Sequence, residues 1–427
     1  MRPTFLIALA ASLATAGWLH AQDASGELRL TDVIRAALTR GPLVEAARAR
    51  VRAAEGARSS ARAFPNPILS WQVENARFPG FTAPSVDRET STFASLPLEF
   101  LFQRGPQVRR AEQGLRAAEA DLAAARWVVV LDATRAFGRV LAAQAALAAA
   151  ADLRAGLSDL STFNQTRVAE GVTPEGDLIR VRVERDRAAL EEAMAEAELA
   201  RAWAELRPFV QTLSASPLPR LATSLPPPPT VPALAALVQR SRQSQPEILA
   251  ARARVDASRA EAAFQRRLSV RQVGLVFGNK RIAGENTMIA GLSLSVPLFN
   301  RNRGEIARAD AERDAAEQEL AWTERRVAAR VEAAHRAAEV MASRLNSLSP
   351  DLLERAEESR RIALAAYREG AGSLLQVLDA SRALAEVRQT YGRALLAGEQ
   401  SLLELRATSG EDPLEGTTDA TLDGGHQ

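Results

Sequence analysis

The side chains that could carry catalytic or metal chemistry are few in this chain and far apart. The sequence has three histidines and no cysteine, which excludes thiolate metal sites, disulfides and cysteine nucleophiles. His335 stands alone in a long helical segment, while His20 and His426 lie near the two ends of the chain. The sequence has no glycine-rich phosphate loop and no serine nucleophile elbow. We therefore expect neither an enzyme nor a bound cofactor or metal.

The charged residues form no block that would suit nucleic acid. The chain carries 54 basic and 52 acidic residues, a formal net charge of +2, and both signs are interspersed along segments rich in Ala, Leu, Arg and Glu. This pattern is typical of solvated faces on long helices. We expect no nucleic acid partner.

The N-terminus predicts export from the cytoplasm. Residues 1–21 have Arg2 near the start, an apolar stretch and a candidate cleavage site after Ala21, which together indicate a signal peptide. Cleavage after Ala16 is a second possibility, and no cysteine follows either site to take a lipid anchor. No later run of 18 apolar residues occurs, so we expect no transmembrane helix and any membrane crossing must use strands.

The elements that must position any functional residues occur twice. Ala46 to Val51 returns as Ala250 to Val255, and later landmarks recur in the same order roughly 200 positions apart. Drift in this spacing indicates small insertions within a duplicated unit. We expect a first repeat at 22–216, a proline-rich linker at 217–232, a second repeat at 233–408 and a disordered tail at 409–427.

Each repeat predicts a helix, two strands and a long helical hairpin. In the first repeat the expected elements are helix 30–63 with a break at Gly41-Pro42, strands from 69 and over 90–98, and helices 107–173 and 174–209. In the second they are helix 231–268, strands 270–278 and 287–298, helix 304–368 with a bend at Pro350, and helix 373–407. Val327, Val331, Ala334 and Ala338 follow the spacing of a coiled-coil seam.

The strands predict a membrane sheet shared between chains. Leu69, Trp71 and Val73 alternate with polar residues, as expected of a strand with one apolar face. Four strands cannot close a barrel, and open edges are not tolerated in lipid. A dimer would have eight strands and a filled lumen, whereas a trimer would have twelve and room for a pore. The fold class we expect is mainly α, with a periplasmic α-barrel of long antiparallel hairpins and four strands per chain in a trimeric twelve-stranded β-barrel.

Several motifs carry a family resemblance over nearly the whole mature chain. They are Trp71-Gln72-Val73-Glu74-Asn75, the stretch 291–304, Tyr367-Arg368-Glu369-Gly370 and the stretch 375–380. Together they resemble the TolC family of outer membrane efflux proteins, and the sequences of the motifs are most similar to the CzcC-like branch associated with heavy-metal export. The resemblance implies a homotrimer in outer membrane lipid, with its helical part in the periplasm, and partnership with a periplasmic adaptor and an inner-membrane RND-type pump.

The two hairpin turns should lie together at the periplasmic end, with glycine supplying positive φ at each helix terminus. The resemblance implies that this tip docks the adaptor and gates the channel. The adaptor-docking residues it suggests are Glu170, Gly171, Tyr367, Glu369, Gly370, Leu374 and Leu378.

The resemblance also implies a gate on the helix after the second turn, where the family can carry two acidic residues. Asp379 matches the second, but Gln376 replaces the first, which weakens the expectation of strong cation selectivity. Asp177 and Arg180 occupy the corresponding positions of the first repeat, and we hypothesise that Arg180 and Asp379 form an ion pair that holds the tip closed.

Pro97 and Pro297 lie at matching positions where a strand gives way to a long helix, which predicts a swivel from sheet to tube. The expected function is passive conduction of metal cations from pump and adaptor to the exterior. Organic compounds are an alternative cargo because the chain has few soft metal ligands. A periplasmic coiled-coil scaffold is the alternative from another class of protein.

Overall fold

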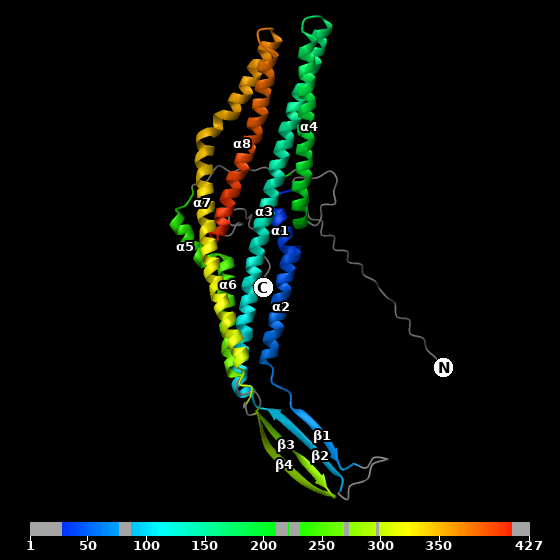
Figure 1. Cartoon of the computed structure of the whole chain (residues 1–427), viewed down its shortest axis with the longest axis vertical. Coiled ribbons are helices and arrows are strands. Elements are labelled where there is room, and N and C mark those ends of the chain that lie inside the picture. Colours follow the sequence, from blue (N-terminus) through cyan, green and yellow to red (C-terminus); the bar gives the residue numbers. More distant parts are fainter. Residues whose placement is uncertain are drawn as a thin grey trace, which may run out of the picture.

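The computed structural model describes residues 28–76, 87–210, 221, 231–268, 273–295 and 299–411. Signal peptide 1–21, most of linker 217–232, Pro297 and most of tail 409–427 lie outside these ranges. The elements are α1 (Leu30–Arg40), α2 (Pro42–Arg62), β1 (Ile68–Glu74), β2 (Glu89–Pro97), α3 (Phe100–Ala169), α4 (Glu175–Leu206), η1 (Arg207–Phe209), α5 (Leu234–Ser244), α6 (Pro246–Arg267), β3 (Val273–Ile282), β4 (Glu285–Leu294), α7 (Arg303–Arg368) and α8 (Leu374–Thr408). Figure 1 shows an elongated helical bundle with a sheet at one end, as the sequence predicts.

The four strands form one antiparallel sheet in the order β1-β2-β3-β4. Pairing of β2 with β3 joins the two repeats, with Phe93 opposite Gly278. A two-residue turn at Ala283-Gly284 connects β3 to β4, and both residues have positive φ, as this hairpin turn requires. The strand expected to end at 278 therefore runs on to Ile282.

The two longest helices run from the sheet to the far end of the molecule. α3 has 70 residues and α7 has 66, which is roughly 100 Å each at 1.5 Å per residue. α3 begins at Phe100, ahead of the expected start at 107, and contains Pro106 near its first turns. Figure 1 shows α7 changing direction along its length, in agreement with the expected bend.

The single helix expected over 231–268 is wrong, because α5 and α6 are separate helices. The break falls at Gln245, immediately before Pro246. Proline disfavours the helical conformation of the residue before it, as Pro42 does at the corresponding break in the first repeat. The Gln245 side chain accepts a hydrogen bond from the Ile248 amide at 3.2 Å, which caps α6.

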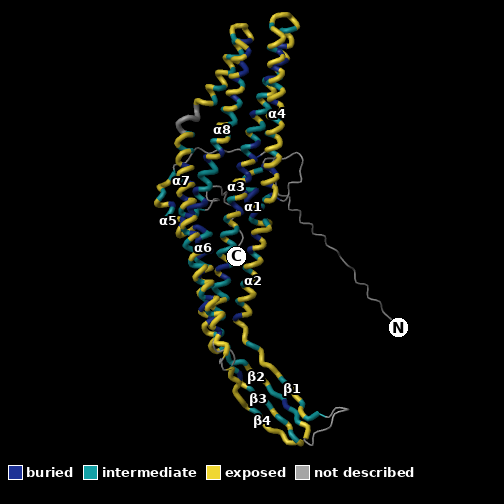
Figure 2. The backbone as a smooth tube through the Cα atoms, viewed as in Figure 1, coloured by how far each residue is buried: buried dark blue, intermediate teal, exposed yellow. Residues whose placement is uncertain are grey.

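The core is a set of narrow stripes along the helix contacts. Val33, Phe137 and Trp203 are buried where α1, α3 and α4 meet. Val327, Val331, Ala334 and Ala338 are buried against α5, α6 and α8, which confirms the seam. Figure 2 shows buried positions recurring along the helices while exposed positions cover the rest of their surface.

α3 differs from the expectation that no helix is apolar enough to cross a membrane. In the described residues it is the one helix with an 18-residue stretch of suitable composition, with a mean hydropathy of 1.3. Long helices that pack against other helices can meet the same test. α3 contacts α2, α4, α6 and α8 along its length, but only 22% of this apolar stretch is buried within the chain.

Candidate functional site

Both helical hairpins turn at the end of the molecule opposite the sheet (Figure 1). In the first turn the Val172 amide donates to the Arg167 carbonyl at 2.9 Å and the Gly171 amide to the Val168 carbonyl at 3.0 Å. Gly171 has a φ of 72°. This pair of bonds around a glycine with positive φ is the Schellman motif, which closes a helix C-terminus.

The second turn repeats the motif. The Ala371 amide donates to the Ala366 carbonyl at 2.9 Å, and Gly370 has a φ of 77°. Ser373 and Gln376 then form a capping box, in which Gln376 Oε1 accepts from the Ser373 amide at 3.0 Å. The predicted gate residue Gln376 therefore caps α8.

Tyr367 links the two hairpins near the tip. Its side chain is buried, and its hydroxyl donates to Oδ1 of Asn164, a fully buried residue of α3. Arg167 donates to the Tyr367 carbonyl at 3.4 Å, and its guanidinium lies 5.6 Å from the centre of the Tyr367 ring. Burial raises the pKa of the Tyr367 hydroxyl, so the hydroxyl keeps its proton and remains a donor.

Neither Asn164 nor Arg167 was predicted from the sequence. The available signal was an asparagine in helical register with the apolar residues Leu157 and Leu160, where a polar side chain needs a buried partner. The partner lies in the other repeat, so the sequence pattern alone did not identify it.

The predicted adaptor-docking residues fall into two groups. Glu170, Gly171, Glu369 and Gly370 are exposed at the two turns. The second group is buried in a cluster that joins α3, α4, α7 and α8, and its members are Tyr367, Leu374 and Leu378. In this conformation the second group holds the hairpins together and is covered by other side chains.

Arg180 and Asp379 form no ion pair with each other among the residues that the structure describes. Asp379 instead lies 3.7 Å from Arg382, one helical turn further along α8. Arg382 Nε also donates to Glu184 of α4 at 3.1 Å. Arg382 therefore takes the place that we expected Arg180 to have beside Asp379. Its bond to Glu184 connects the two hairpins. Asp177 is partly buried and Arg180 is exposed.

A second arginine makes a similar connection. Arg388 of α8 donates to Asp152 of α3 at 2.9 Å and to Glu357 of α7 at 2.8 Å. Neither Arg382 nor Arg388 was predicted from the sequence. Both connect residues of the two repeats, so their roles depend on how the hairpins sit side by side.

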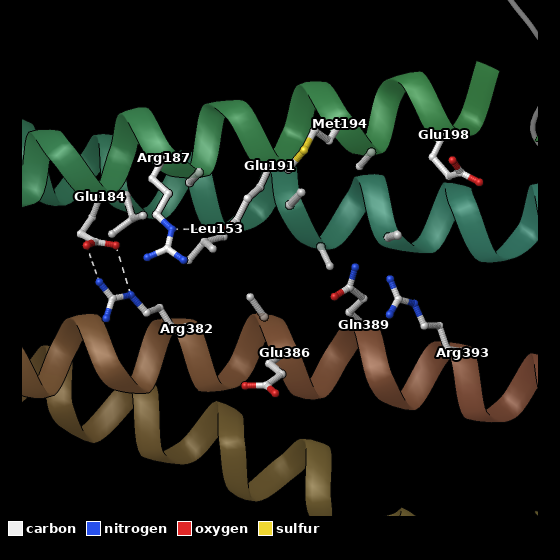
Figure 3. A pocket seen from close by; sticks show the side chains of 17 residues that line it. Leu153, Glu184, Arg187, Glu191, Met194, Glu198, Arg382, Glu386, Gln389 and Arg393 are labelled. Atoms are coloured by element: carbon white, nitrogen blue, oxygen red, sulfur yellow. Dashed lines mark hydrogen bonds and ion pairs between the residues drawn. The ribbon is translucent and has the colours of Figure 1, made fainter. Parts of the chain in front are cut away.

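A groove runs between α4 and α8, with α3 as its floor. Figure 3 shows Glu184, Glu191 and Glu198 on α4 and Arg382, Gln389 and Arg393 on α8 along its two sides. The floor includes Ala146, Ala149 and Ala150. The groove therefore has an apolar floor, in which alanines alternate with Leu153 and Leu157, between two polar sides.

The sheet has two faces of different character. By register, one face carries Leu69, Phe277 and Leu292, all strongly exposed. The opposite face carries Gln72, Ser91, Lys280 and Thr287, and Lys280 pairs with Glu89 there. An exposed apolar face suits lipid and the polar face suits a water-filled lumen.

Pro97 ends β2 three residues before α3 begins, and the next amide, Leu98, donates to the Val273 carbonyl at 2.6 Å. Pro97 therefore lies at the strand-to-helix transition, and its role as a swivel stays a prediction. Within the described residues, no group of three or more His, Asp or Glu side chains is placed to hold a metal ion.

Comparison with known proteins gives consistent matches over both repeats. The family model for outer membrane efflux proteins matches residues 33–210 and 237–411. The cobalt-zinc-cadmium resistance protein CzcC of Cupriavidus metallidurans is 26% identical over 402 residues, which cover 92% of each chain.

Solved structures share the fold. The outer-membrane channel OprN matches with a TM-score of 0.74 and 20% identity, covering 90% of each chain. CusC matches with a TM-score of 0.73 and 19% identity, covering 90% of this chain and 92% of CusC.

Proposed function

Because the chain belongs to the outer membrane efflux protein family, we propose that it is the outer membrane channel of a tripartite efflux system. It is a channel protein of the outer membrane, with its helices in the periplasm. In the proposed system an inner-membrane RND-type pump supplies the energy, a periplasmic adaptor joins pump to channel, and this chain conducts the cargo passively to the exterior.

The observation that carries this proposal is the two-faced sheet beneath the helical hairpins. Both outer strands, β1 and β4, have only one neighbour in the sheet. Open edges in lipid leave backbone groups unpaired, at a cost of several kcal/mol each. Closure by three chains would pair every edge, place Leu69 and Leu292 toward lipid, and line a lumen with Gln72 and Thr287. We therefore infer a homotrimer.

Metal cations are the cargo that we propose. The support is the similarity to CzcC, named as a cobalt-zinc-cadmium resistance protein. Organic compounds are the second candidate, because the mature chain has no cysteine and few histidines or methionines to relay soft metal ions. Cargo selection would then rest with the pump and adaptor.

The periplasmic tip is the proposed gate and docking end. Glu170, Gly171, Glu369 and Gly370 present exposed turns to the adaptor, while Tyr367, Leu374 and Leu378 hold the hairpins together behind them. Gln376, Asp379, Asp177 and Arg180 are the proposed gate residues, with Asp379 supplying the acidic group. Pro97 and Pro297 are the proposed swivels.

The test is planar-bilayer conductance of the purified protein, with its oligomeric mass measured on the same sample. We expect discrete channels from a trimer, and we expect Asp379→Ala to change single-channel conductance, with the exposed Glu386→Ala as control. A non-conducting species would overturn the channel. Unchanged conductance in Asp379→Ala would show that Asp379 is not part of the gate.

A second experiment separates the two cargo classes. The gene is returned to a host from which the channel has been deleted, and resistance to zinc and to organic dyes is measured. Restored resistance to zinc would support metal cations, and restored resistance to dyes would support organic compounds.

A further inference from the structure

Basic residues gather where the helical bundle meets the sheet. The last turns of α2 and α6, the first turns of α3 and the residues leading into α7 all lie at this junction (Figure 1). Six arginines there form a set that we call the arginine collar: Arg62, Arg104, Arg109, Arg267, Arg301 and Arg303. Most carboxylates of the same region already pair with arginines of the chain: Glu112 with Arg62, Glu261 with Arg110, Glu305 with Arg308 and Asp310 with Arg266.

The collar is built on fixed backbone. Arg104 donates to the Arg62 carbonyl at 2.9 and 3.3 Å, and its guanidinium lies 4.6 Å from the centre of the Phe64 ring. In the second repeat the buried Asn302 has a φ of 60° and donates to the Gln265 carbonyl at 2.8 Å. This bond places Arg301 and Arg303 beside the end of α6, where Arg267 lies.

Several collar arginines have no carboxylate partner. Arg109, Arg267, Arg301 and Arg303 are exposed. Among the described residues, none of these four forms an ion pair, whereas other exposed arginines at the junction do, such as Arg62 with Glu112 at 2.8 Å. These four guanidinium groups are therefore available to an anion from outside the chain.

Apolar side chains are exposed beside them. The exposed fraction is 65% for Phe64, 72% for Leu101 and 100% for Phe299. Exposed apolar side chains mixed with arginines are unfavourable in water but suit the border of a bilayer, where acyl chains meet charged headgroups. Phe64 precedes β1, Leu101 follows β2 and Phe299 follows β4 in the chain, so all three lie near the helical end of the sheet.

We propose that the arginine collar binds the phosphate-bearing headgroups of anionic phospholipids in the periplasmic leaflet and so sets the depth of the sheet in the membrane. Guanidinium groups bind phosphate oxygens bidentately, and basic residues near an anionic leaflet each strengthen binding about fivefold. Phe64, Leu101 and Phe299 favour a lipid over free phosphate. The inference rests on the outer membrane location and is independent of efflux, so its failure would leave the proposed channel untouched.

The test is a native mass spectrometry titration of the detergent-purified assembly with phosphatidylglycerol, phosphatidylethanolamine or inorganic phosphate. We expect wild type to retain phosphatidylglycerol more tightly than phosphatidylethanolamine, with no comparable retention of inorganic phosphate. Arg109→Gln/Arg267→Gln/Arg303→Gln should weaken phosphatidylglycerol binding more than tenfold, at about fivefold for each arginine. The matched control removes three exposed helix-surface arginines away from the junction: Arg201→Gln/Arg336→Gln/Arg361→Gln.

The outcomes separate the possibilities. If both triple variants lose phosphatidylglycerol binding equally, the effect comes from net charge, and the proposed lipid site at the arginine collar is wrong. Equal retention of the two lipids by wild type would also overturn it, and this measurement does not depend on any variant folding. Retention of inorganic phosphate at similar strength would assign an anion site in place of a lipid surface. The matching Arg→Lys triple should keep the preference for phosphatidylglycerol but bind it more weakly, since lysine preserves charge without bidentate geometry.

Discussion

At the scale of single residues, the tip depends on a few buried polar contacts between the two hairpins. The Tyr367 hydroxyl and the Asn164 amide satisfy each other inside an apolar cluster, and the Asn164 amide also donates to the Leu160 carbonyl at 2.9 Å. A buried polar group that loses its partner costs about 1–3 kcal/mol. If the tip is the gate that we propose, such contacts would hold its two hairpins together while each remains weak enough to break on opening.

We predict that Tyr367→Phe loosens the tip. The change leaves Asn164 Oδ1 buried without its donor, and we expect the closed arrangement to lose about 1–3 kcal/mol. Planar-bilayer recordings should show higher conductance than wild type. Tyr391→Phe on α8 removes a hydroxyl outside this cluster and serves as the control. If the two variants conduct alike, the Tyr367–Asn164 bond does not restrain the tip.

We predict that protonation of Glu399 makes the stability of the folded chain depend on pH. Burial raises the pKa of its carboxyl above 4.5, and its Oε1 has no hydrogen-bond partner among the described residues. A raised pKa means that the folded chain binds the proton more tightly than the unfolded chain does. The stability from this group is present below about pH 4.5 and is lost as the pH rises through the folded pKa.

Glu399→Gln should therefore stabilise the protein near neutral pH, by at most about 1 kcal/mol, because it removes the charge of a half-buried carboxylate whose Oε1 has no hydrogen-bond partner among the described residues. Thermal unfolding at about pH 8 should show a higher Tm than wild type, and the gain should vanish at about pH 4. Glu386→Gln, an exposed position on the same helix, should change stability little. A gain that is the same at both pH values would contradict the assignment to the Glu399 charge.

At the scale of elements, the duplicated Schellman turns define the tip. Gly171 and Gly370 have φ values of 72° and 77°, and a Cβ atom at either position would meet nothing within 4 Å. Their glycines are needed for backbone conformation, since the space for a side chain is open. Both hairpins thus end in the same turn, as duplication implies.

Gly370→Ala should destabilise the second hairpin by about 1 kcal/mol, because alanine disfavours positive φ. Gly114→Ala, inside α3 and about four turns from its start, is the matched control: its Cβ also meets nothing within 4 Å, and helical φ should make it stabilising by about 0.5–1 kcal/mol. Chemical denaturation of both variants provides the measurement. Stabilisation by Gly370→Ala would show that the turn does not require its positive φ.

At the scale of the whole molecule, the sheet determines the assembly. An even number of antiparallel strands lets β4 of one chain pair antiparallel with β1 of the next, so copies can close without a mismatched edge. The narrow helical core and the exposed apolar residues on α4, such as Val183 and Leu190, leave further surface to cover. One chain alone therefore presents both open edges and uncovered helix faces.

The orientation of the sheet can be tested with neighbouring residues. Leu292 and Ser293 are adjacent on β4 but point to opposite faces. Leu292→Arg should cost about 2–4 kcal/mol in the membrane and reduce the heat-resistant oligomer seen by gel electrophoresis. Ser293→Arg should assemble normally and alter ion selectivity. The reverse result would exchange the lipid and lumen faces.

The sequence alone determined the duplication, the helix breaks at glycine and proline, the alternating strands and the turn glycines. These features are local, since period, proline and positive φ each act within a few residues. The rule that identified the break at Pro42 also applies at Pro246, so the missed boundary there was predictable. Membership of the outer membrane efflux family was likewise recognisable from motifs such as Tyr367-Arg368-Glu369-Gly370.

Only the tertiary structure decided which residues meet across the repeats. The pairing of β2 with β3, the Tyr367–Asn164 bond and the bond from Arg382 to Glu184 all join residues far apart in sequence. Burial of Leu374 and Leu378 has the same origin, because it requires α3 and α4 to lie beside α8. Hydrophobic periodicity specifies which helix face is covered but leaves open which partner covers it, and that depends on how the hairpins pack.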